Sequence, residues 1–272
     1  MNRIDQTFRR LKRQNRKALI GYITAGYPNK PSFRKLVPLL EHSGLDLLEV
    51  GVPFSDPIAD GPTIQHASQI ALENGVTLHW ILRSIRNLRR ESIALPVILM
   101  SYCNPIHAMG IDRFFKAARA SGVDGLILPD MIPEESGPYA RAAKREGIAL
   151  IFLVAPITPK PRIRAIARKT RGFLYAVSMT GVTGVQKAVP AQVTGFLKMV
   201  GGVSSRPVAV GFGLTTPEQI QAVSRYADGV IVGSALIRAI EKSKGSSFNA
   251  AGRFVESLAR ALNPGKDTSY AS

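Results

Sequence analysis

The segment Leu-Leu-Glu-Val-Gly-Val-Pro-Phe-Ser-Asp-Pro-Ile-Ala-Asp-Gly-Pro-Thr-Ile-Gln, at residues 47–65, reads as a strand, a proline-rich loop and the start of a helix. One acid, Glu49, lies within the otherwise apolar strand, and a second acid, Asp60, follows in the loop. A buried carboxylate is unfavourable by several kcal/mol unless something compensates it. Two carboxylates at one rim of a fold therefore indicate acid–base chemistry.

Short apolar runs alternate with helical patterns along the rest of the chain. The runs are rich in Val, Ile and Leu with little alternation, which is typical of strands covered on both faces. The expected strands are 18–24, 46–50, 97–102, 125–128, 149–154, 173–178, 208–211 and 229–232. The expected helices are 31–43, 62–74, 77–90, 111–121, 134–146, 160–170, 190–200, 217–225 and 247–261.

Eight strands that are each followed by a helix, in about 250 residues, fit an α/β fold of the closed (β/α)8 type, the TIM barrel. An open doubly wound sheet is the alternative, because periodicity alone does not show closure. We expect a single domain over residues 1–262 that begins with a docked N-terminal helix, since Ile4, Phe8 and Leu11 have helical spacing. Residues 263–272 are polar and are expected to form a disordered tail. No residue-level repeat is evident beyond the alternation of strands and helices.

The composition limits the classes of protein to which the chain can belong. With 272 residues, 45% of them hydrophobic, it can bury a substantial core. The longest apolar run, near 93–100, is interrupted by Pro96 and is far shorter than the roughly 20 residues that span a bilayer. The single cysteine, Cys103, allows no intrachain disulfide, and the charged N-terminus has no apolar signal segment. We expect a cytoplasmic protein that does not bind a membrane.

The net charge of +17 is strongly basic and favours contact with phosphates, nucleic acid or an acidic partner. The basic residues are scattered over expected helical surfaces, however, and no aromatic platform accompanies them. We therefore expect a solvated basic surface and no nucleic-acid partner, with a nucleic-acid-binding module as the alternative. The four histidines do not have metal-ligand spacing, so we expect no metal.

Glu49 is the first candidate catalytic residue, because active sites of barrels lie where strands end. By period-two alternation Leu47, Glu49 and Gly51 share one face of their strand. If that face lines the barrel interior, burial would raise the pKa of Glu49 toward neutrality, which suits a proton shuttle. The alternatives are a Glu49 paired with an arginine or a backbone donor, and an Asp60 that only builds a turn with Gly61.

A phosphate site is indicated at the other end of the chain. Gly211-Phe212-Gly213 ends the seventh strand, and Gly233-Ser234 ends the eighth before a short helix at 235–241. In barrels these two loops and the N-terminus of a short extra helix commonly bind phosphate. Glycines let backbone N–H groups approach the anion, and the helix dipole favours its charge. The alternative is that these glycines only relieve crowding between strands and loops.

The glycine-rich loop at residues 179–187 could act as a lid that excludes water, and its Gly184 could reach the phosphate. Tyr175 lies late in the sixth strand and either lines a pocket or packs with its hydroxyl satisfied. No lysine lies near the C-terminal end of a strand, which disfavours a Schiff-base aldolase. Carbon–carbon cleavage at this site would therefore depend on an electron sink within the substrate. A sugar-phosphate isomerase is the alternative enzyme, although it has no need of the 56–65 loop.

The segment at residues 48–65 resembles the signature of the tryptophan synthase alpha subunit family. The matching positions elsewhere are Gly26 with Pro28, Tyr102 with Asn104, Pro129-Asp130, Gly181-Val182-Thr183-Gly184, Gly211-Phe212-Gly213 and Gly233-Ser234. The resemblance implies a TIM-barrel lyase of tryptophan biosynthesis that splits indole-3-glycerol phosphate into indole and glyceraldehyde 3-phosphate. The chain departs from the family pattern at Met179-Thr180, where some members have Arg-Ala, and at Pro133, which comes one place later.

The resemblance also implies the roles of individual residues. Glu49 would protonate the indole C3 and take the proton from the glycerol hydroxyl, Asp60 would accept a hydrogen bond from the indole N–H, and Tyr175 would lie near the reacting side chain. The implied phosphate-binding residues are Gly184, Phe212, Gly213, Gly233 and Ser234. The implied indole pocket consists of Tyr22, Met100, Ile127 and Thr183, together with Phe212.

The family pattern implies a partner as well. Indole would pass to a beta subunit that carries pyridoxal phosphate, in an alpha2beta2 heterotetramer, and the alpha chain itself would need no cofactor. The loop at 53–57 and the stretches near Asn104 and at 130–133 would face the beta subunit.

Overall fold

Nine parallel strands form the centre of the molecule in this computed structural model, which describes residues 2–177, 191–211, 213–243 and 247–265. The order across the sheet is β5-β4-β3-β2-β1-β9-β8-β7-β6. The strands are β1 (Ala18–Thr24), β2 (Leu47–Gly51), β3 (Val97–Met100), β4 (Gly125–Ile127), β5 (Ala149–Ile151), β6 (Leu153–Val154), β7 (Leu174–Val177), β8 (Val208–Gly211) and β9 (Gly229–Val232). All eight predicted strands are present, and the fifth is divided in two.

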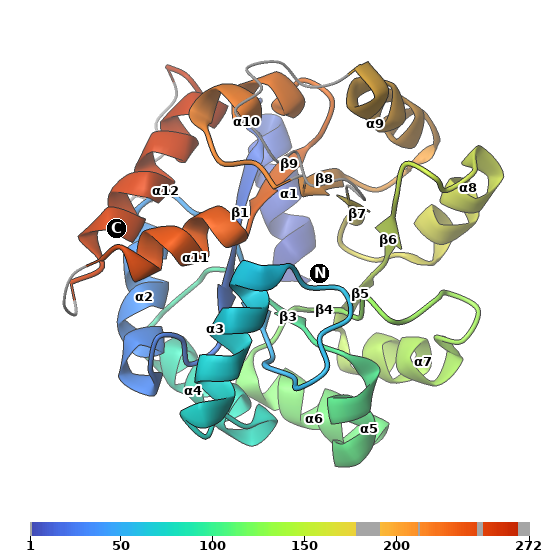
Figure 1. Cartoon of the computed structure of the whole chain (residues 1–272). Coiled ribbons are helices and arrows are strands. Elements are labelled where there is room, and N and C mark those ends of the chain that lie inside the picture. The colour runs from blue at the N-terminus through green and yellow to red at the C-terminus, as the bar shows by residue number, and fades with distance from the viewer. Residues whose placement is uncertain (1, 178–190, 212, 244–246, 266–272) are drawn as a thin grey trace.

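The two strands at the ends of this order, β5 and β6, are consecutive in the chain and are separated only by Phe152. β5 pairs with β4, and β6 pairs with β7. The Phe152 carbonyl accepts a hydrogen bond from the Tyr175 N–H at 3.1 Å, and the Leu150 carbonyl accepts one from the Arg171 N–H at 2.9 Å. The sheet therefore closes into a nearly complete barrel, which confirms the (β/α)8 prediction over the open sheet (Figure 1).

Twelve helices surround or cap the barrel in the described part of the chain (Figure 1). They are α1 (Arg3–Arg13), α2 (Lys30–His42), α3 (Pro62–Glu73), α4 (Leu78–Arg90), α5 (Cys103–Met109), α6 (Ile111–Ser121), α7 (Gly137–Glu146), α8 (Lys160–Lys169), α9 (Ala191–Val203), α10 (Pro217–Ser224), α11 (Ser234–Glu241) and α12 (Asn249–Leu262). Over the described helices, none combines the length and the apolar character that crossing a membrane requires.

The structure corrects the end of one predicted strand and the start of one predicted helix, and it adds a helix that was not predicted. The strand expected to reach residue 102 ends at Met100, and the unpredicted helix α5 begins at Cys103. The N-terminus of α5 is held from outside its own sequence, because the Asp130 carboxylate accepts the Cys103 N–H at 2.9 Å. The helix expected from residue 134 begins only at Gly137, since the preceding residues form a turn in which the Ser136 hydroxyl donates to the Pro133 carbonyl at 2.8 Å.

The N-terminal helix α1 closes one end of the barrel, as predicted, and lies behind the strands in Figure 1. Its Ile4, Phe8 and Leu11 belong to the same apolar cluster as the inward-facing residues of the strands. The rings of Phe8 and Phe173 lie 5.7 Å apart. A Cβ at Gly125 would lie 2.9 Å from the Ile4 side chain, so a larger residue there would displace the helix. The barrel is consequently blocked at the N-terminal ends of its strands.

The structure shows a recurring polar contact at the N-terminal ends of the strands. An aspartate precedes three of the strands, and each one binds the first or second residue of the strand before it through both its backbone N–H and its carboxylate. The three pairs are Asp46 with Leu19, Asp124 with Val97 and Asp228 with Val208, with N–H to Oδ2 distances of 3.0, 3.0 and 2.9 Å. Thr170 holds the Phe152 N–H in the same way, at 2.9 Å through its hydroxyl. Three pairs of neighbouring strands are thus fastened alike at their N-terminal ends, and Thr170 makes only the side-chain part of this contact, at Phe152 between β5 and β6.

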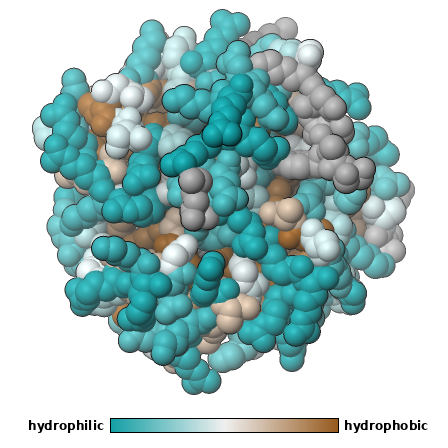
Figure 2. Space-filling view, turned by 180° about the vertical axis from the view of Figure 1, so that it is seen from behind, coloured by the Kyte–Doolittle hydropathy of each residue, from teal (hydrophilic) through white to brown (hydrophobic). Residues whose placement is uncertain are grey.

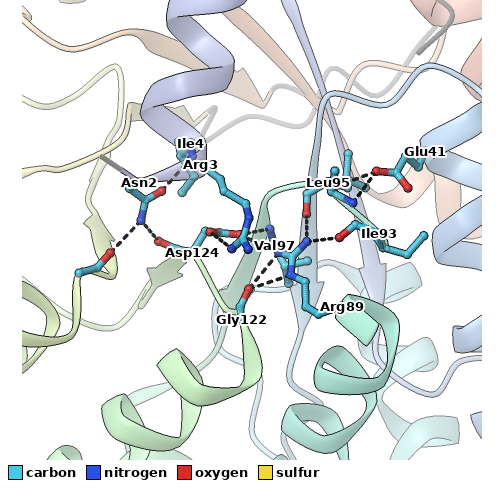
Figure 3. A network of polar contacts seen from close by, with 12 residues as sticks. Asn2, Arg3, Ile4, Glu41, Arg89, Ile93, Leu95, Val97, Gly122 and Asp124 are labelled. Atoms are coloured by element: carbon cyan, nitrogen blue, oxygen red, sulfur yellow. Dashed lines mark hydrogen bonds and ion pairs between the residues drawn. The ribbon is translucent and has the colours of Figure 1, made fainter. Parts of the chain in front are cut away.

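Asp124 is the centre of the largest of these fastenings (Figure 3). Its carboxylate binds Arg3 at 3.0 Å and Arg89 at 2.8 Å, in addition to the Val97 N–H. Arg89 also donates to the carbonyls of Gly122, Ile93 and Leu95. The network ties α1 and α4 to the bottom of β3 and β4.

The polar tail expected from residue 263 begins as part of the folded structure. Asn263 is buried, and its side chain accepts the Lys17 N–H at 2.8 Å and donates to the Lys17 carbonyl at 3.1 Å. Residues 266–272 lie outside the described part of the chain.

Candidate active site

Glu49 lies on β2 and faces the interior of the barrel. Leu47, two residues before it, belongs to the interior cluster, whereas Leu48 and Val50 pack in the layer between the strands and the helices. Glu49 pairs in register with Tyr22 of β1. The inward direction that the alternation of the sequence predicted is therefore confirmed.

The Glu49 carboxyl group is completely buried, and neither of its oxygens has a hydrogen-bond partner among the described residues. Burial raises the pKa of Glu49 to about 8. The alternative of a structural Glu49 paired with an arginine or a backbone donor is not observed within the described residues. At neutral pH the group holds a proton that it can donate.

Asp60 lies in the loop between β2 and α3 and is half-buried. Its carboxylate accepts a hydrogen bond from the Tyr102 hydroxyl at 3.1 Å, and the same hydroxyl accepts the Ala59 N–H at 2.9 Å. Burial raises the pKa of Asp60, and the bond from Tyr102 opposes that rise. Gln65 of α3 donates to the Asp60 carbonyl at 2.8 Å, so the backbone of Asp60 is held as well as its carboxylate.

Tyr102 is a site residue that reasoning from single positions missed. The chain carries it just beyond β3, beside β2, so its ring reaches across to the loop that holds Asp60. The available signal was an aromatic hydroxyl directly after a strand that neighbours the Glu49 strand. Its function in the structure is to orient Asp60.

Tyr175 on β7 and Tyr22 on β1 complete the group around Glu49. Both side chains are buried, and burial raises the pKa of each phenol. The charges of Glu49 and Asp60 raise both values further, which places the four groups within one electrostatic neighbourhood. The two predicted acids and Tyr175 are thus brought together.

Two glycines make room for these phenols. A Cβ at Gly51 would collide with the Tyr22 hydroxyl, and a Cβ at Gly211 would lie 2.8 Å from the Tyr175 hydroxyl. Both glycines lie at the last residue of their strand. A side chain at either position would push a tyrosine into the space above Glu49.

The indole-pocket prediction falls on the same inner face. Gly51 of β2 pairs with Met100 of β3, which pairs with Ile127 of β4. Met100 is half-buried, and Ile127 is fully buried within the interior cluster. With Tyr22 they form an apolar wall beside the acids. Thr183 lies outside the described residues.

The predicted phosphate-binding residues follow two neighbouring strands, β8 and β9. Gly213 has φ +63°, and its Cα faces open space. Gly233 is the N-cap of α11, and Ser234 is the first residue of that helix, one position earlier than predicted. No side chain caps this N-terminus, so its backbone N–H groups remain available to an anion. Gly184 and Phe212 lie outside the described residues.

The glycine pair and the acids adjoin each other. A Cβ at Gly233 would be 3.6 Å from the Tyr22 Cβ and 3.9 Å from Ile64 of α3. α11 and α3 lie side by side in front of the strands in Figure 1. One molecule could therefore contact both the helix N-terminus and the carboxyl groups. The described residues contain no cluster of three or more His, Cys, Asp or Glu side chains that could hold a metal.

Comparisons with known proteins agree with this geometry. The family model described as tryptophan synthase alpha chain matches residues 8–263. The chain is 46% identical over 264 residues to the tryptophan synthase alpha chain of Geobacter sulfurreducens, covering 96% of this chain and 98% of that protein. It is 43% identical over 263 residues to the protein of that name from Dehalococcoides mccartyi, covering 97% and 100%.

Solved structures show the same likeness. The structure of tryptophan synthase subunit alpha from Legionella pneumophila superposes with a TM-score of 0.90 at 38% identity, covering 97% of this chain and 99% of that one. The tryptophan synthase structure of Mycobacterium tuberculosis gives a TM-score of 0.89 at 37% identity, with coverage of 97% and 99%. On the family match and the identities together, the chain belongs to the tryptophan synthase alpha chain family.

Proposed function

We infer that this chain is a lyase that cleaves indole-3-glycerol phosphate into indole and glyceraldehyde 3-phosphate, a step of tryptophan biosynthesis. Membership of the tryptophan synthase alpha chain family supports this activity over the sugar-phosphate isomerase and the nucleic-acid-binding module. The observation that carries the inference is Glu49, whose buried and unpartnered carboxyl group has a pKa of about 8 beside Asp60.

Glu49 acts as both acid and base in the proposed reaction. In its protonated form it gives its proton to C3 of the indole ring, which converts the ring into an iminium ion that can accept an electron pair. As a carboxylate it then takes the proton of the glycerol hydroxyl next to the ring, and the carbon–carbon bond breaks. The electron pair returns to the ring, which leaves as indole, and the other product is the aldehyde. A group with a pKa near neutrality suits both transfers.

Asp60 accepts the indole N–H in this proposal and stabilises the positive charge that develops on the ring in the iminium ion. That function requires the ionised carboxylate, which the hydrogen bond from Tyr102 favours. Tyr175 lies near the reacting side chain. Since the indole ring itself is the electron sink, the reaction requires neither a lysine Schiff base nor a metal.

Binding of the substrate divides between two groups of residues. The ring is proposed to lie against the apolar wall, and the phosphate to lie at the N-terminus of α11. The proposed indole pocket is formed by Tyr22, Met100, Ile127 and Thr183. The proposed phosphate ligands are Gly184, Phe212, Gly213, Gly233 and Ser234.

Membership of the family also supports a proposal for the partner and the compartment. We propose that the chain works in the cytoplasm with a beta subunit that receives the indole, in an alpha2beta2 assembly. Pyridoxal phosphate would be carried by the beta subunit, with no cofactor in this chain. The loop at 53–57 and the residues near Asn104 and at 130–133 are the proposed contact surface.

Release of indole from indole-3-glycerol phosphate is the direct test, measured for the native chain and for Glu49→Gln. A positioned general acid–base typically contributes about 10²- to 10⁴-fold, so kcat should fall by that factor. Glu73→Gln is the matched control, because Glu73 is an exposed glutamate of α3 and should leave the rate unchanged. A Glu49→Gln chain with full activity would remove Glu49 from the mechanism, and turnover of a sugar phosphate that lacks indole would favour the isomerase.

A further inference from the structure

A groove separates α7 from α8 on the outside of the barrel. α7 packs on α6, and α8 packs on α9, but α7 and α8 make little contact with each other. Between them lies a cavity of about 670 Å³. Seen from behind, apolar surface lies between hydrophilic side chains on the side of the molecule that carries these helices (Figure 2).

The floor of this groove is apolar. It is formed by Ile148, Leu150 and Phe152, from β5 and the residues on either side of it, and by Ala143 of α7. Leu150 and Phe152 belong to the layer outside the strands, whereas Ile151 between them faces the barrel interior. The groove is therefore on the opposite side of β5 from the space that holds Glu49.

The rim of the groove is positively charged. Four cations line it: Lys144, Arg168, Lys169 and Arg171. Its one acid, Glu134, is already bound by the guanidinium of Arg162 at 2.7 and 2.9 Å. Lys169 interacts electrostatically with the same carboxylate, whereas Lys144, Arg168 and Arg171 form no ion pair with a described residue.

Two of these cations, Lys144 of α7 and Arg168 of α8, line the groove from opposite walls. Lys169 donates to the Pro133 carbonyl at 3.0 Å, and Arg171 donates to backbone carbonyls. Within the described residues, neither Lys144 nor Arg168 forms a side-chain hydrogen bond or an ion pair. Each lies in the last turn of its helix, where the dipole favours a cation, but the dipole does not explain why both line one apolar hollow.

We propose that the groove between α7 and α8 binds a small amphipathic organic anion, with its apolar body on the floor of the groove and its acidic head between Lys144 and Arg168. The cavity has the size of ordinary ligand sites, about 300–1,000 Å³, and combines an apolar lining with a few convergent polar groups as they do. The negative head would relieve the repulsion between two cations that no acid separates. Carboxylate, sulfonate and phosphate heads share this chemistry.

The test uses 8-anilinonaphthalene-1-sulfonate, an aromatic anion that becomes fluorescent in apolar surroundings, with the full-length chain. We expect saturable binding of one molecule per chain. The double variant Lys144→Gln with Arg168→Gln should weaken binding about tenfold or more, since it removes both charge-assisted contacts. Arg141→Gln with Arg164→Gln is the matched control, because it removes the same charge from the same two helices at residues that do not line the groove.

A second variant tests whether the probe occupies the space of the groove, without changing its charge. Ala140→Leu places a larger side chain at the edge of the groove on α7 and should block the probe while leaving the charge intact. Equal weakening by the two charge variants would overturn the proposal, because it would reduce the binding to general attraction by a basic protein. Displacement of the probe by glyceraldehyde 3-phosphate, a phosphate without an apolar body, would also overturn it, since the probe would then occupy the substrate site. Unchanged affinity in Ala140→Leu would exclude the groove.

Discussion

Glu49 and Asp124 are both buried acids of the barrel, but they differ in whether other groups bind their carboxylates. Glu49, 0% exposed, lies toward the C-terminal ends of the strands and has no hydrogen-bond partner among the described residues. Asp124, 4% exposed, lies just before β4 at the N-terminal ends and is held by Arg3, Arg89 and the Val97 N–H (Figure 3). Burial alone therefore does not distinguish a catalytic acid from a structural one.

The catalytic and the structural acid differ in whether neighbouring groups compensate the charge of the carboxylate. An uncompensated buried charge is unfavourable, so a fold keeps one only where another requirement outweighs stability. At the N-terminal ends, the buried Asp46 and the exposed Asp228 each accept a backbone N–H of the strand before them, as Asp124 does. Stability is thus concentrated at one end of the barrel and chemistry at the other, which is the general division of labour in TIM barrels.

Replacement of Asp124 by asparagine should have the largest effect on stability. It leaves Arg89 buried without its counter-charge, and removing one partner from a buried pair typically lowers the free energy of unfolding by roughly 3–5 kcal/mol. Urea unfolding monitored by circular dichroism measures the change. Asp112→Asn is the control, since that exposed aspartate pairs with Arg145 on the surface and should change stability by less than about 1 kcal/mol. If Asp124→Asn and Asp112→Asn lowered the free energy of unfolding by similar amounts, Asp124 would not be the strongly stabilising buried acid that we infer.

Replacement of Glu49 by glutamine should change stability in the opposite direction, by an amount that grows as the pH rises. The pKa of Glu49 is about 8 in the folded chain against 4.5 for an unperturbed carboxyl group, so the folded state holds the proton more tightly than the unfolded state. The native chain should therefore lose stability as the pH rises from about 4.5 to about 8. Because glutamine does not ionise, the Glu49→Gln variant should not lose stability in this way.

The difference between Glu49→Gln and the native chain should be near zero at about pH 5 and roughly 2–4 kcal/mol in favour of the variant at about pH 9. Urea unfolding at the two pH values gives the numbers, and Glu73→Gln should show no such divergence because Glu73 is exposed. A variant that is less stable than the native chain at high pH would mean that Glu49 is compensated after all.

The sequence predicted the elements that depend on local pattern. β1, β8 and β9 have the predicted bounds, α1 docks through Ile4, Phe8 and Leu11, and Glu49 faces inward because alternation along a strand is a local property.

The features that were missed depend on residues far apart in the chain. α5 requires a carboxylate 27 residues away at Asp130, and the division of the fifth strand at Phe152 depends on which neighbours each half pairs with. The aspartate repeat was visible in part, since Ser43-Gly44-Leu45-Asp46 and Ser121-Gly122-Val123-Asp124 are nearly the same sequence. Its meaning depends on the strand before, which only the sheet register supplies.

Asp60 lies between Glu49 and Asp124 in how far its charge is compensated. It is half-buried, and its carboxylate accepts a hydrogen bond from the Tyr102 side chain. Tyr102→Phe removes that hydrogen bond and keeps the ring. The loss of one such bond corresponds to about 1–2 kcal/mol, or roughly 5- to 30-fold in kcat/KM for indole-3-glycerol phosphate. Since the bond lowers the pKa of Asp60 against the effect of burial, its removal should raise that pKa. The acid limb of the kcat/KM profile should then move to higher pH, because the ionised form is the one that stabilises the ring.

Tyr139→Phe is the control for this variant, because Tyr139 is a buried tyrosine of α7 that does not contact Asp60. It should leave the acid limb in place even if it lowers stability. A general structural role for Tyr102 would lower the rate at every pH equally, without moving the limb. That result would mean that burial alone adjusts the pKa of Asp60, as it does that of Glu49, and that Tyr102 holds the loop without setting the protonation of the carboxylate.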